Sequence, residues 1–211
     1  MLLNKLLKIV LIISLVLLII TLNFKLLALN QNFYQEEFNK LNIYDKIPDA
    51  DKNALNLINY IKDREQLNNF FNEKEKLHMK DVKNLIQKIF LLFYTSLILT
   101  ILLLIYFIYT KNYKIILNSI FLSSLSTIII TLILFLSLLN FNIAFTKFHL
   151  IIFSNNLWQL NSETDNLINL FPLEFFYDIT KQIIINILIS SFILIILTLI
   201  IKIKIKQKIF K

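Results

Sequence analysis

Four long stretches without a charged residue constrain this chain more than any other feature of its sequence. They cover residues 9–24, 89–109, 115–139 and 183–201. An α-helix rises about 1.5 Å per residue, so about 20 residues cross a hydrocarbon core of about 30 Å. The last three stretches have that length, and the first reaches it if its helix continues to residue 29. The sequence therefore predicts an all-α membrane protein with four transmembrane helices.

The first apolar stretch also has features of a signal peptide, because two lysines precede its apolar core. A cleaved signal peptide ends in a small-x-small pattern, whereas Ala28 stands here between leucines. We therefore expect an uncleaved span over 9–29. The whole chain, 1–211, is expected to form a single membrane domain with two long connections at 30–88 and 140–182.

Basic residues are distributed unequally along the chain. The N-terminal region, the turn between the second and third spans and the C-terminal tail contain nine lysines and no acidic residue. These are Lys5, Lys8, Lys111, Lys114, Lys202, Lys204, Lys206, Lys208 and Lys211. The positive-inside rule then predicts cytoplasmic termini and an extracytoplasmic cap built from the two connections. The net charge of +8 reflects this topology and attraction to anionic lipid, and it does not indicate nucleic-acid binding.

The chain contains neither cysteine nor glycine. Without cysteine there is no disulfide and no thiol nucleophile. Without glycine there is no P-loop, no dinucleotide-binding fingerprint and no Gly-x-Ser-x-Gly nucleophile elbow. We therefore expect a function without a nucleotide or another cofactor.

Local patterns predict further structure in the connections. Apolar spacing favours a helix over residues 49–71, beginning at Pro48-Asp49, and a second helix from about Asn72 into the second span. Residues 141–153 are apolar, β-branched and aromatic, which suggests a short extended stretch along the membrane interface. Residues 162–165 fit a capping box for a helix that Pro172 ends.

The only two histidines, His78 and His149, both lie in the connections. Imidazole titrates near neutral pH, so two of them on one side of a membrane are candidates for proton transfer. Asp81 lies one helical turn after His78 and could orient its ring. His149 has apolar neighbours and needs a polar partner or a substrate. The simpler interpretations are a partly exposed histidine at 78, an interfacial anchor at Trp158 and a capping residue at Asp165.

Two other functional classes are compatible with these patterns. One is a non-enzymatic four-span protein whose external segments bind a partner or sense lipid packing. The other is a metal-dependent membrane hydrolase. We do not expect a metal site, because the His-Glu-x-x-His motif is missing and no spacing imposes tetrahedral geometry.

Several runs occur in a specific order relative to the spans. They are His78-Met79-x-Asp81-Val82, Phe148-His149-x-x-x-Phe153-x-Asn155-x-x-Trp158, Leu160, Thr164-Asp165-x-Leu167-Ile168-x-Leu170-Phe171-Pro172 and Phe175-Phe176. In this combination the chain resembles, over nearly its whole length, the lipoprotein intramolecular transacylases, a family of small four-span bacterial membrane proteins.

The resemblance implies an acyltransferase of the bacterial cell membrane that acts on diacylglyceryl-modified lipoproteins. The sn-2 ester acyl chain moves to the α-amine of the modified cysteine, giving a lyso-form lipoprotein. The implied catalytic residues are His78 and His149. Asp81, Asn155, Trp158 and Asp165 are implied as supporting or substrate-positioning residues. We favour direct aminolysis with His149 as the base, while an acyl-imidazole intermediate is the alternative.

Overall fold

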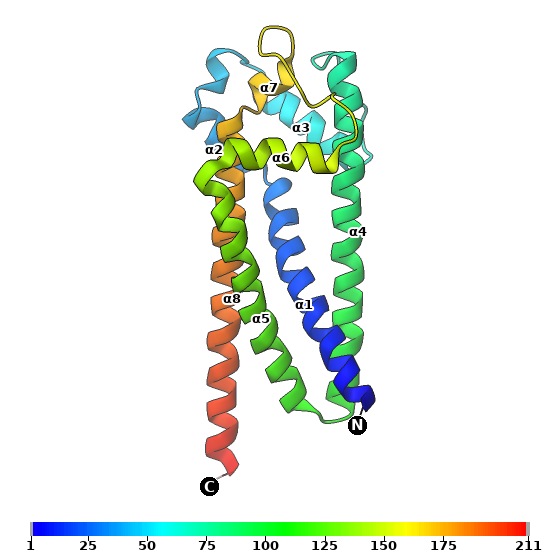
Figure 1. Cartoon of the computed structure of the whole chain (residues 1–211), viewed down its shortest axis with the longest axis vertical. Coiled ribbons are helices and arrows are strands. Elements are labelled where there is room, and N and C mark those ends of the chain that lie inside the picture. Colours follow the sequence, from blue (N-terminus) through cyan, green and yellow to red (C-terminus); the bar gives the residue numbers. More distant parts are fainter. Residues whose placement is uncertain (1, 210–211) are drawn as a thin grey trace. The chain divides into compact units, whose positions relative to one another are not determined.

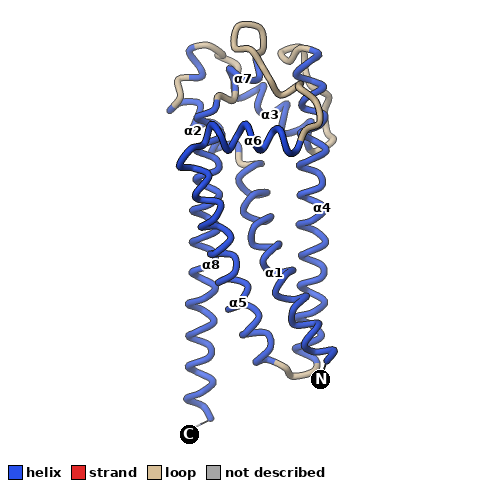
Figure 2. The backbone as a smooth tube through the Cα atoms, viewed as in Figure 1, coloured by secondary structure: helices blue, strands red, loops and turns tan. Residues whose placement is uncertain are grey.

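The computed structural model describes residues 2–209, with side chains through Gln207. Lys211 and the side chain of Lys208, which the charge analysis includes, lie outside the described residues. Within the described part, every regular element is helical and no strand occurs (Figure 2). The all-α fold class is therefore confirmed.

Four helices are long. They are α1 (Leu2–Ala28), α4 (Glu73–Tyr109), α5 (Tyr113–Phe135) and α8 (Leu173–Ile209) (Figure 1). The shorter elements are α2 (Gln31–Lys40), α3 (Ala50–Ile61), α6 (Phe141–Ile152), α7 (Asn166–Leu170) and the 3-10 helices η1 (Ile43–Asp45) and η2 (Leu136–Asn140). Four helical segments are long and apolar enough to cross a membrane, as the sequence predicted. At most 22% of the most apolar window of each is buried, so these side chains need lipid as their solvent.

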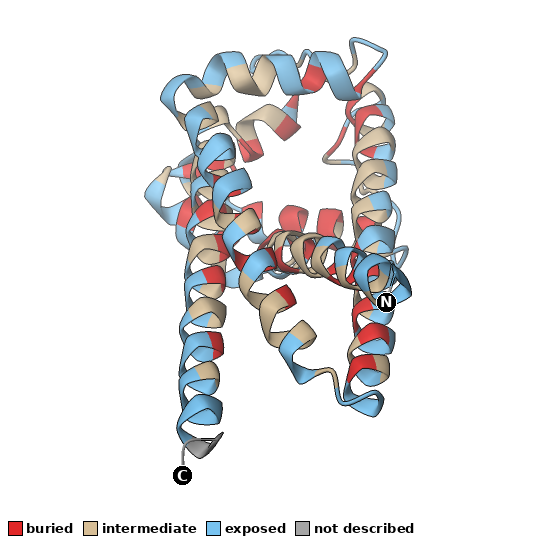
Figure 3. Ribbon diagram, turned by 60° about the horizontal axis from the view of Figure 1, so that its bottom comes forward, coloured by how far each residue is buried: buried red, intermediate tan, exposed pale blue. Residues whose placement is uncertain are grey.

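The chain forms two compact units. The first unit, here called the bundle, comprises residues 1–24, 90–135 and 183–211. Its core contains Leu11 of α1 with Leu103 and Phe107 of α4. Figure 3 shows buried and exposed positions alternating along α4 and α8, as expected for helices with one face toward protein.

Small hydroxyl side chains fill the contact positions of the bundle. Ser119, Ser123, Ser124, Thr127 and Thr131 of α5 are all fully buried. The last four donate hydrogen bonds to carbonyl oxygens of the preceding helical turn. In a chain without glycine, serine and threonine are the small residues that allow membrane helices to approach closely.

The second unit, here called the connection unit, comprises residues 25–89 and 136–182. The two predicted connections thus fold together into one compact body. One part of its core is aromatic: Tyr34 and Phe38 of α2 pack against Phe171 and against Phe175 of α8, with ring centroids 5.2–6.0 Å apart. The Tyr34 hydroxyl donates to the Ala28 carbonyl oxygen at 2.9 Å.

The extended stretch predicted over 141–153 is wrong, because this segment forms helix α6. Asn140 caps the helix by accepting a hydrogen bond from the Ile143 amide at 3.4 Å. Phe145 and His149 are four residues apart and therefore share one helix face. That packing outweighs the weak preference of β-branched residues for extended structure.

The helix predicted over 49–71 is shorter than expected. It ends at Ile61 with a Schellman motif, in which Asp63 takes a left-handed conformation with φ 58°. The Arg64 amide donates a hydrogen bond to the carbonyl oxygen of Asn59, and the Asp63 amide donates one to the carbonyl oxygen of Tyr60. These bonds satisfy two carbonyl groups of the last helical turn. Glycine usually marks such an end, and this chain has none to reveal it.

The capping box predicted at 162–165 is also wrong. Helix α7 begins at Asn166, and the Asp165 side chain makes no capping hydrogen bond to it. A capping box does occur at the start of α4. There the Asn72 side chain accepts from the Glu75 amide at 3.0 Å, and the Glu75 carboxylate accepts from the Asn72 amide at 2.6 Å. The predicted helix start near Asn72 is confirmed.

Candidate active site

His78 lies in the second turn of α4, within the connection unit. Its ring is buried, and its Nδ1 atom has no hydrogen-bond partner in the described part of the chain. The Phe153 ring packs edge-on against it at a centroid distance of 5.2 Å. This is the environment of a histidine withdrawn from solvent.

His149 lies near the end of α6 and is also buried. Its Nδ1 atom is 2.7 Å from the carbonyl oxygen of Phe145, one turn earlier in the same helix. A carbonyl oxygen only accepts hydrogen bonds, so this contact assigns the proton to Nδ1. The Nε2 atom of neutral His149 then carries the lone pair and can act as a base.

The fold brings the two histidines together. Their ring centroids are 6.2 Å apart with an interplanar angle of 35°, although 71 positions separate them in the sequence. Around His149 lie Phe145, Trp158 and Phe153, with ring centroids at 4.3, 5.0 and 5.6 Å. The structure therefore places the two imidazoles side by side, and their catalytic roles stay predictions.

Trp158 shares an unusual feature with His78. Its indole Nε1 atom is buried and has no hydrogen-bond partner among the described residues. The indole N–H is a donor, and a buried donor without a partner costs about 1–3 kcal/mol. Both of these unpartnered ring nitrogens belong to side chains next to His149.

Asp81 does not orient His78 through the hydrogen bond that the sequence suggested. Its carboxylate accepts a hydrogen bond from the Asn155 side-chain amide at 2.9 Å. The Asn155 side-chain oxygen in turn accepts from the Leu157 amide at 3.1 Å. The pair thus ties α4 to the loop that follows α6, which is the loop that carries Trp158.

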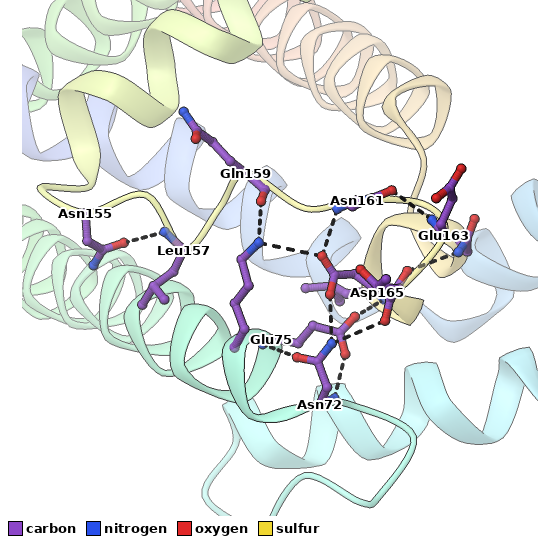
Figure 4. A network of polar contacts seen from close by, with 12 residues as sticks. Asn72, Glu75, Asn155, Leu157, Gln159, Asn161, Glu163 and Asp165 are labelled. Carbon is purple, nitrogen blue, oxygen red and sulfur yellow. Dashed lines mark hydrogen bonds and ion pairs between the residues drawn. The ribbon is translucent and has the colours of Figure 1, made fainter.

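Asp165 is the centre of a polar network in the same unit, shown in Figure 4. Its carboxylate accepts hydrogen bonds from the Asn161 amide at 2.7 Å and from the Asn72 side chain at 2.8 Å. The Lys74 ammonium lies 3.7 Å away and also donates to the Gln159 carbonyl oxygen. The backbone hydrogen bond from Asn161 is the largest cause that lowers the pKa of Asp165, and Asn72 and Lys74 add to it.

Glu75 is a buried residue that the sequence analysis missed. One carboxylate oxygen completes the capping box of α4, and the other accepts a hydrogen bond from the Leu167 amide in the first turn of α7. A single side chain therefore satisfies the N-termini of two helices (Figure 4). The N-x-x-E pattern at 72–75 was the available signal for its part in the capping box.

Other features of the described residues lie outside this site. They contain no group of three or more His, Asp or Glu side chains arranged to hold a metal ion. A cavity of about 230 Å³ is lined by residues of α2 and α3, including Tyr34, Leu55 and Ile58, and neither histidine contributes to it. The histidine pair and its aromatic surroundings are therefore the candidate for chemistry.

Comparison with known proteins agrees with this fold. The model of the lipoprotein intramolecular transacylase Lit family matches residues 9–176. The chain belongs to this family. This transacylase is similar to the solved in meso structure of the membrane integral lipoprotein intramolecular transacylase Lit from Bacillus cereus, with 26% identity, 99% of each chain covered and a TM-score of 0.86.

Two further structures of the Bacillus cereus protein, each with one histidine replaced, by arginine or by alanine, match with TM-scores of 0.82 and 0.81. Both are 26% identical, and the matches cover 98% and 99% of this chain and 95% and 96% of theirs. No match was found among curated protein sequences. The transacylase is thus an acyltransferase of lipoproteins and an integral membrane protein, as the sequence resemblance implied.

Proposed function

We propose that His78 and His149 carry out the transfer of the sn-2 acyl chain of a diacylglyceryl lipoprotein to the α-amine of its N-terminal cysteine. The product is a lyso-form lipoprotein with an N-acyl chain and a free glyceryl hydroxyl. The observation that carries this proposal is the distance of 6.2 Å between the two buried imidazoles. At this separation both rings can contact the same ester group of a bound substrate.

Donor and acceptor belong to one molecule, so the enzyme mainly has to fold the substrate into an attack geometry. The conversion of an ester into an amide is downhill, and the reaction needs no nucleotide. Near pH 7 a usable fraction of an α-amine with a pKa of about 7.7–8.0 is already neutral. The remaining task is to move one proton from the attacking nitrogen to the departing oxygen.

His149 is the proposed base. Its Nδ1–H is engaged by the Phe145 carbonyl oxygen, so Nε2 is left to accept the proton. The amine nitrogen attacks the ester carbon, His149 takes the proton from that nitrogen, and the bond to the glyceryl oxygen breaks as His149 returns the proton to it. His78 is the electrostatic partner, with a ring N–H that stabilises the charge on the former carbonyl oxygen.

The proposed site faces the extracytoplasmic side, with both termini in the cytoplasm. The lysine distribution supports this orientation. The lipoprotein substrate then resides in the same leaflet, its acyl chains among membrane lipids. The aromatic residues around the histidines, buried Phe153 and half-buried Phe145 and Trp158, would hold the glyceryl region.

Mass spectrometry of lipoprotein N-terminal peptides tests the function, because fragmentation distinguishes an acyl group on nitrogen from one on glyceryl oxygen at unchanged mass. We expect His78→Ala and His149→Ala each to abolish the conversion. Lys80→Ala on α4 and Lys147→Ala on α6 are matched controls, since both lysines are exposed beside the histidines.

Folded, membrane-inserted histidine variants that still produce the N-acyl form would contradict the proposed role of the two histidines. An acyl pattern that is the same in cells with and without the folded protein would favour a partner-binding role. An acyl-imidazole adduct trapped by rapid acid quenching would instead contradict direct aminolysis. Loss of activity with a chelator would support the metal-dependent hydrolase.

A further inference from the structure

We propose that the indole N–H of Trp158 donates a hydrogen bond to the oxyanion that forms during acyl transfer. The inference rests on the proposed function, because it assumes that the ester carbonyl reacts beside His149. It assigns Trp158 a catalytic role that packing or membrane anchoring would not require.

The first observation is the state of the Trp158 nitrogen. An interfacial tryptophan places its N–H among headgroups or water, whereas Trp158 Nε1 is buried without a partner among the described residues. More than about 90% of buried polar groups in folded proteins have a partner. A donor that contacts neither solvent nor a protein acceptor is free to bind an acceptor atom of the substrate.

The second observation is the position of this donor. The indole ring lies 5.0 Å from the His149 ring, with an interplanar angle of 33°. His149 also faces His78, whose Nδ1 is the other buried, unpartnered side-chain nitrogen in the described part of the connection unit. Two free nitrogens thus flank the proposed base, and an oxyanion site commonly uses more than one donor.

The third observation concerns the other donors of this region. The Asn155 amide donates to Asp81, and the Lys74 ammonium donates to the Gln159 carbonyl oxygen beside Asp165. The Nδ1–H of His149 is engaged by the Phe145 carbonyl oxygen. These donors already have hydrogen-bond partners within the protein, whereas Trp158 Nε1 and His78 Nδ1 have none among the described residues.

The step balances without any change in Trp158. The amine nitrogen forms a bond to the ester carbon, and the carbonyl electron pair moves onto oxygen, where the indole N–H donates to it. When the intermediate collapses, the electron pair re-forms the carbonyl, and the glyceryl oxygen leaves with the proton held by His149. Trp158 keeps its proton throughout.

The single tryptophan of the chain allows a clean test. Replacing tryptophan by 3-benzothienylalanine during expression changes only position 158 and exchanges the N–H for sulfur with nearly the same ring shape. We expect kcat to fall about 10²–10³-fold, the effect of removing one oxyanion donor, with KM changed less than about threefold. Protein with 5-fluorotryptophan, which retains the N–H, serves as the control and keeps its activity.

Two outcomes would overturn the inference: kcat of the benzothienyl protein within about threefold of the unlabelled protein, or a change confined to KM. His149→Ala in the same assay separates the two proposals. If it is inactive while the benzothienyl protein is fully active, the proposed function stands and the role of Trp158 fails. If both histidine variants are active, the proposed function itself fails.

A second measurement uses the unmodified protein and does not depend on the folding of a variant. A lipopeptide with a phosphonate in place of the sn-2 ester presents anionic oxygens where the oxyanion would form. The protein has one indole N–H and therefore one such resonance in a ¹⁵N-tryptophan spectrum. We expect its proton signal to move downfield on saturation with the phosphonate, and an unmoved signal would overturn the inference.

Discussion

Asp165 and His149 are both buried polar residues of the second connection, yet their surroundings differ. Asp165 accepts hydrogen bonds from a backbone amide and a side chain and lies near Lys74. Both carboxylate oxygens of Asp165 therefore already have partners within the protein. His149 has one nitrogen bound to a carbonyl oxygen and makes otherwise only ring contacts. The first pattern is that of a positioning residue and the second that of a residue able to react.

Asp165→Asn should therefore lower the free energy of unfolding by about 1–3 kcal/mol at neutral pH, the cost of leaving buried partners poorly satisfied. The folded-state pKa of Asp165 is lowered, so its stabilisation is present above its unfolded pKa of about 3.9 and is lost as pH falls through the folded value. The difference between variant and wild type should narrow below about pH 4. Denaturant unfolding in detergent, at several pH values, measures it.

Glu163→Gln is the control for this change, because Glu163 is exposed and two residues away. Its effect should stay within about 0.5 kcal/mol. Equal stability of Asp165→Asn and the wild type at pH 7 would show that the network is not stabilising.

At the scale of elements, the capped N-terminus of α4 fixes where the helix that carries His78 begins. Glu75 caps α4 and binds the first turn of α7, and His78 follows three residues later. Asp81, one turn further, binds the loop after α6 through Asn155. Successive turns of one helix therefore hold the second connection against the first.

Glu75→Ala should cost about 2–4 kcal/mol, since it removes the acceptor for amides of two helices while their donors stay buried. Faster hydrogen exchange at the Leu167 amide of α7 is the specific signature. Glu73→Ala is the matched control on the same turn, because the Glu73 side chain is 87% exposed. Unchanged exchange at Leu167 in Glu75→Ala would contradict the shared cap.

At the scale of the whole molecule, four apolar helical segments and one compact unit made from the two long connections form the chain. Most residues in the apolar part of each of these segments are not buried by other parts of the protein. Their removal from water therefore depends on lipid. The lysines of the termini and the short turn supply the asymmetry that orients such a bundle.

A reporter that is active only in the cytoplasm should work when fused after Lys211, and one inserted near Glu65 in the first connection should not. The reason is the excess of nine lysines over acidic residues in the segments predicted to face the cytoplasm. A reporter active only outside the cell should behave in the opposite way. External activity of the C-terminal fusion would reverse the proposed orientation.

Hydrophobic length and charge are local properties of a chain, and they determined much of this protein from its sequence alone. Uninterrupted apolar runs predicted the four membrane segments, and the motif order around His78 and His149 indicated the family. The start of the helix near Asn72 was predicted for the same reason, because the spacing of apolar residues is also a local property of the chain.

Only the tertiary structure decided which long-range partner each polar group finds. It turned residues 141–152 into a helix, since packing of the face with Phe145 and His149 outweighs intrinsic preference. It paired the Asp81 carboxylate with the side-chain amide of Asn155, and the Glu75 carboxylate with the Leu167 amide of α7, through hydrogen bonds. It also brought His78 to His149 and left the Trp158 nitrogen buried without a partner, because contacts between residues far apart in sequence depend on how whole elements pack.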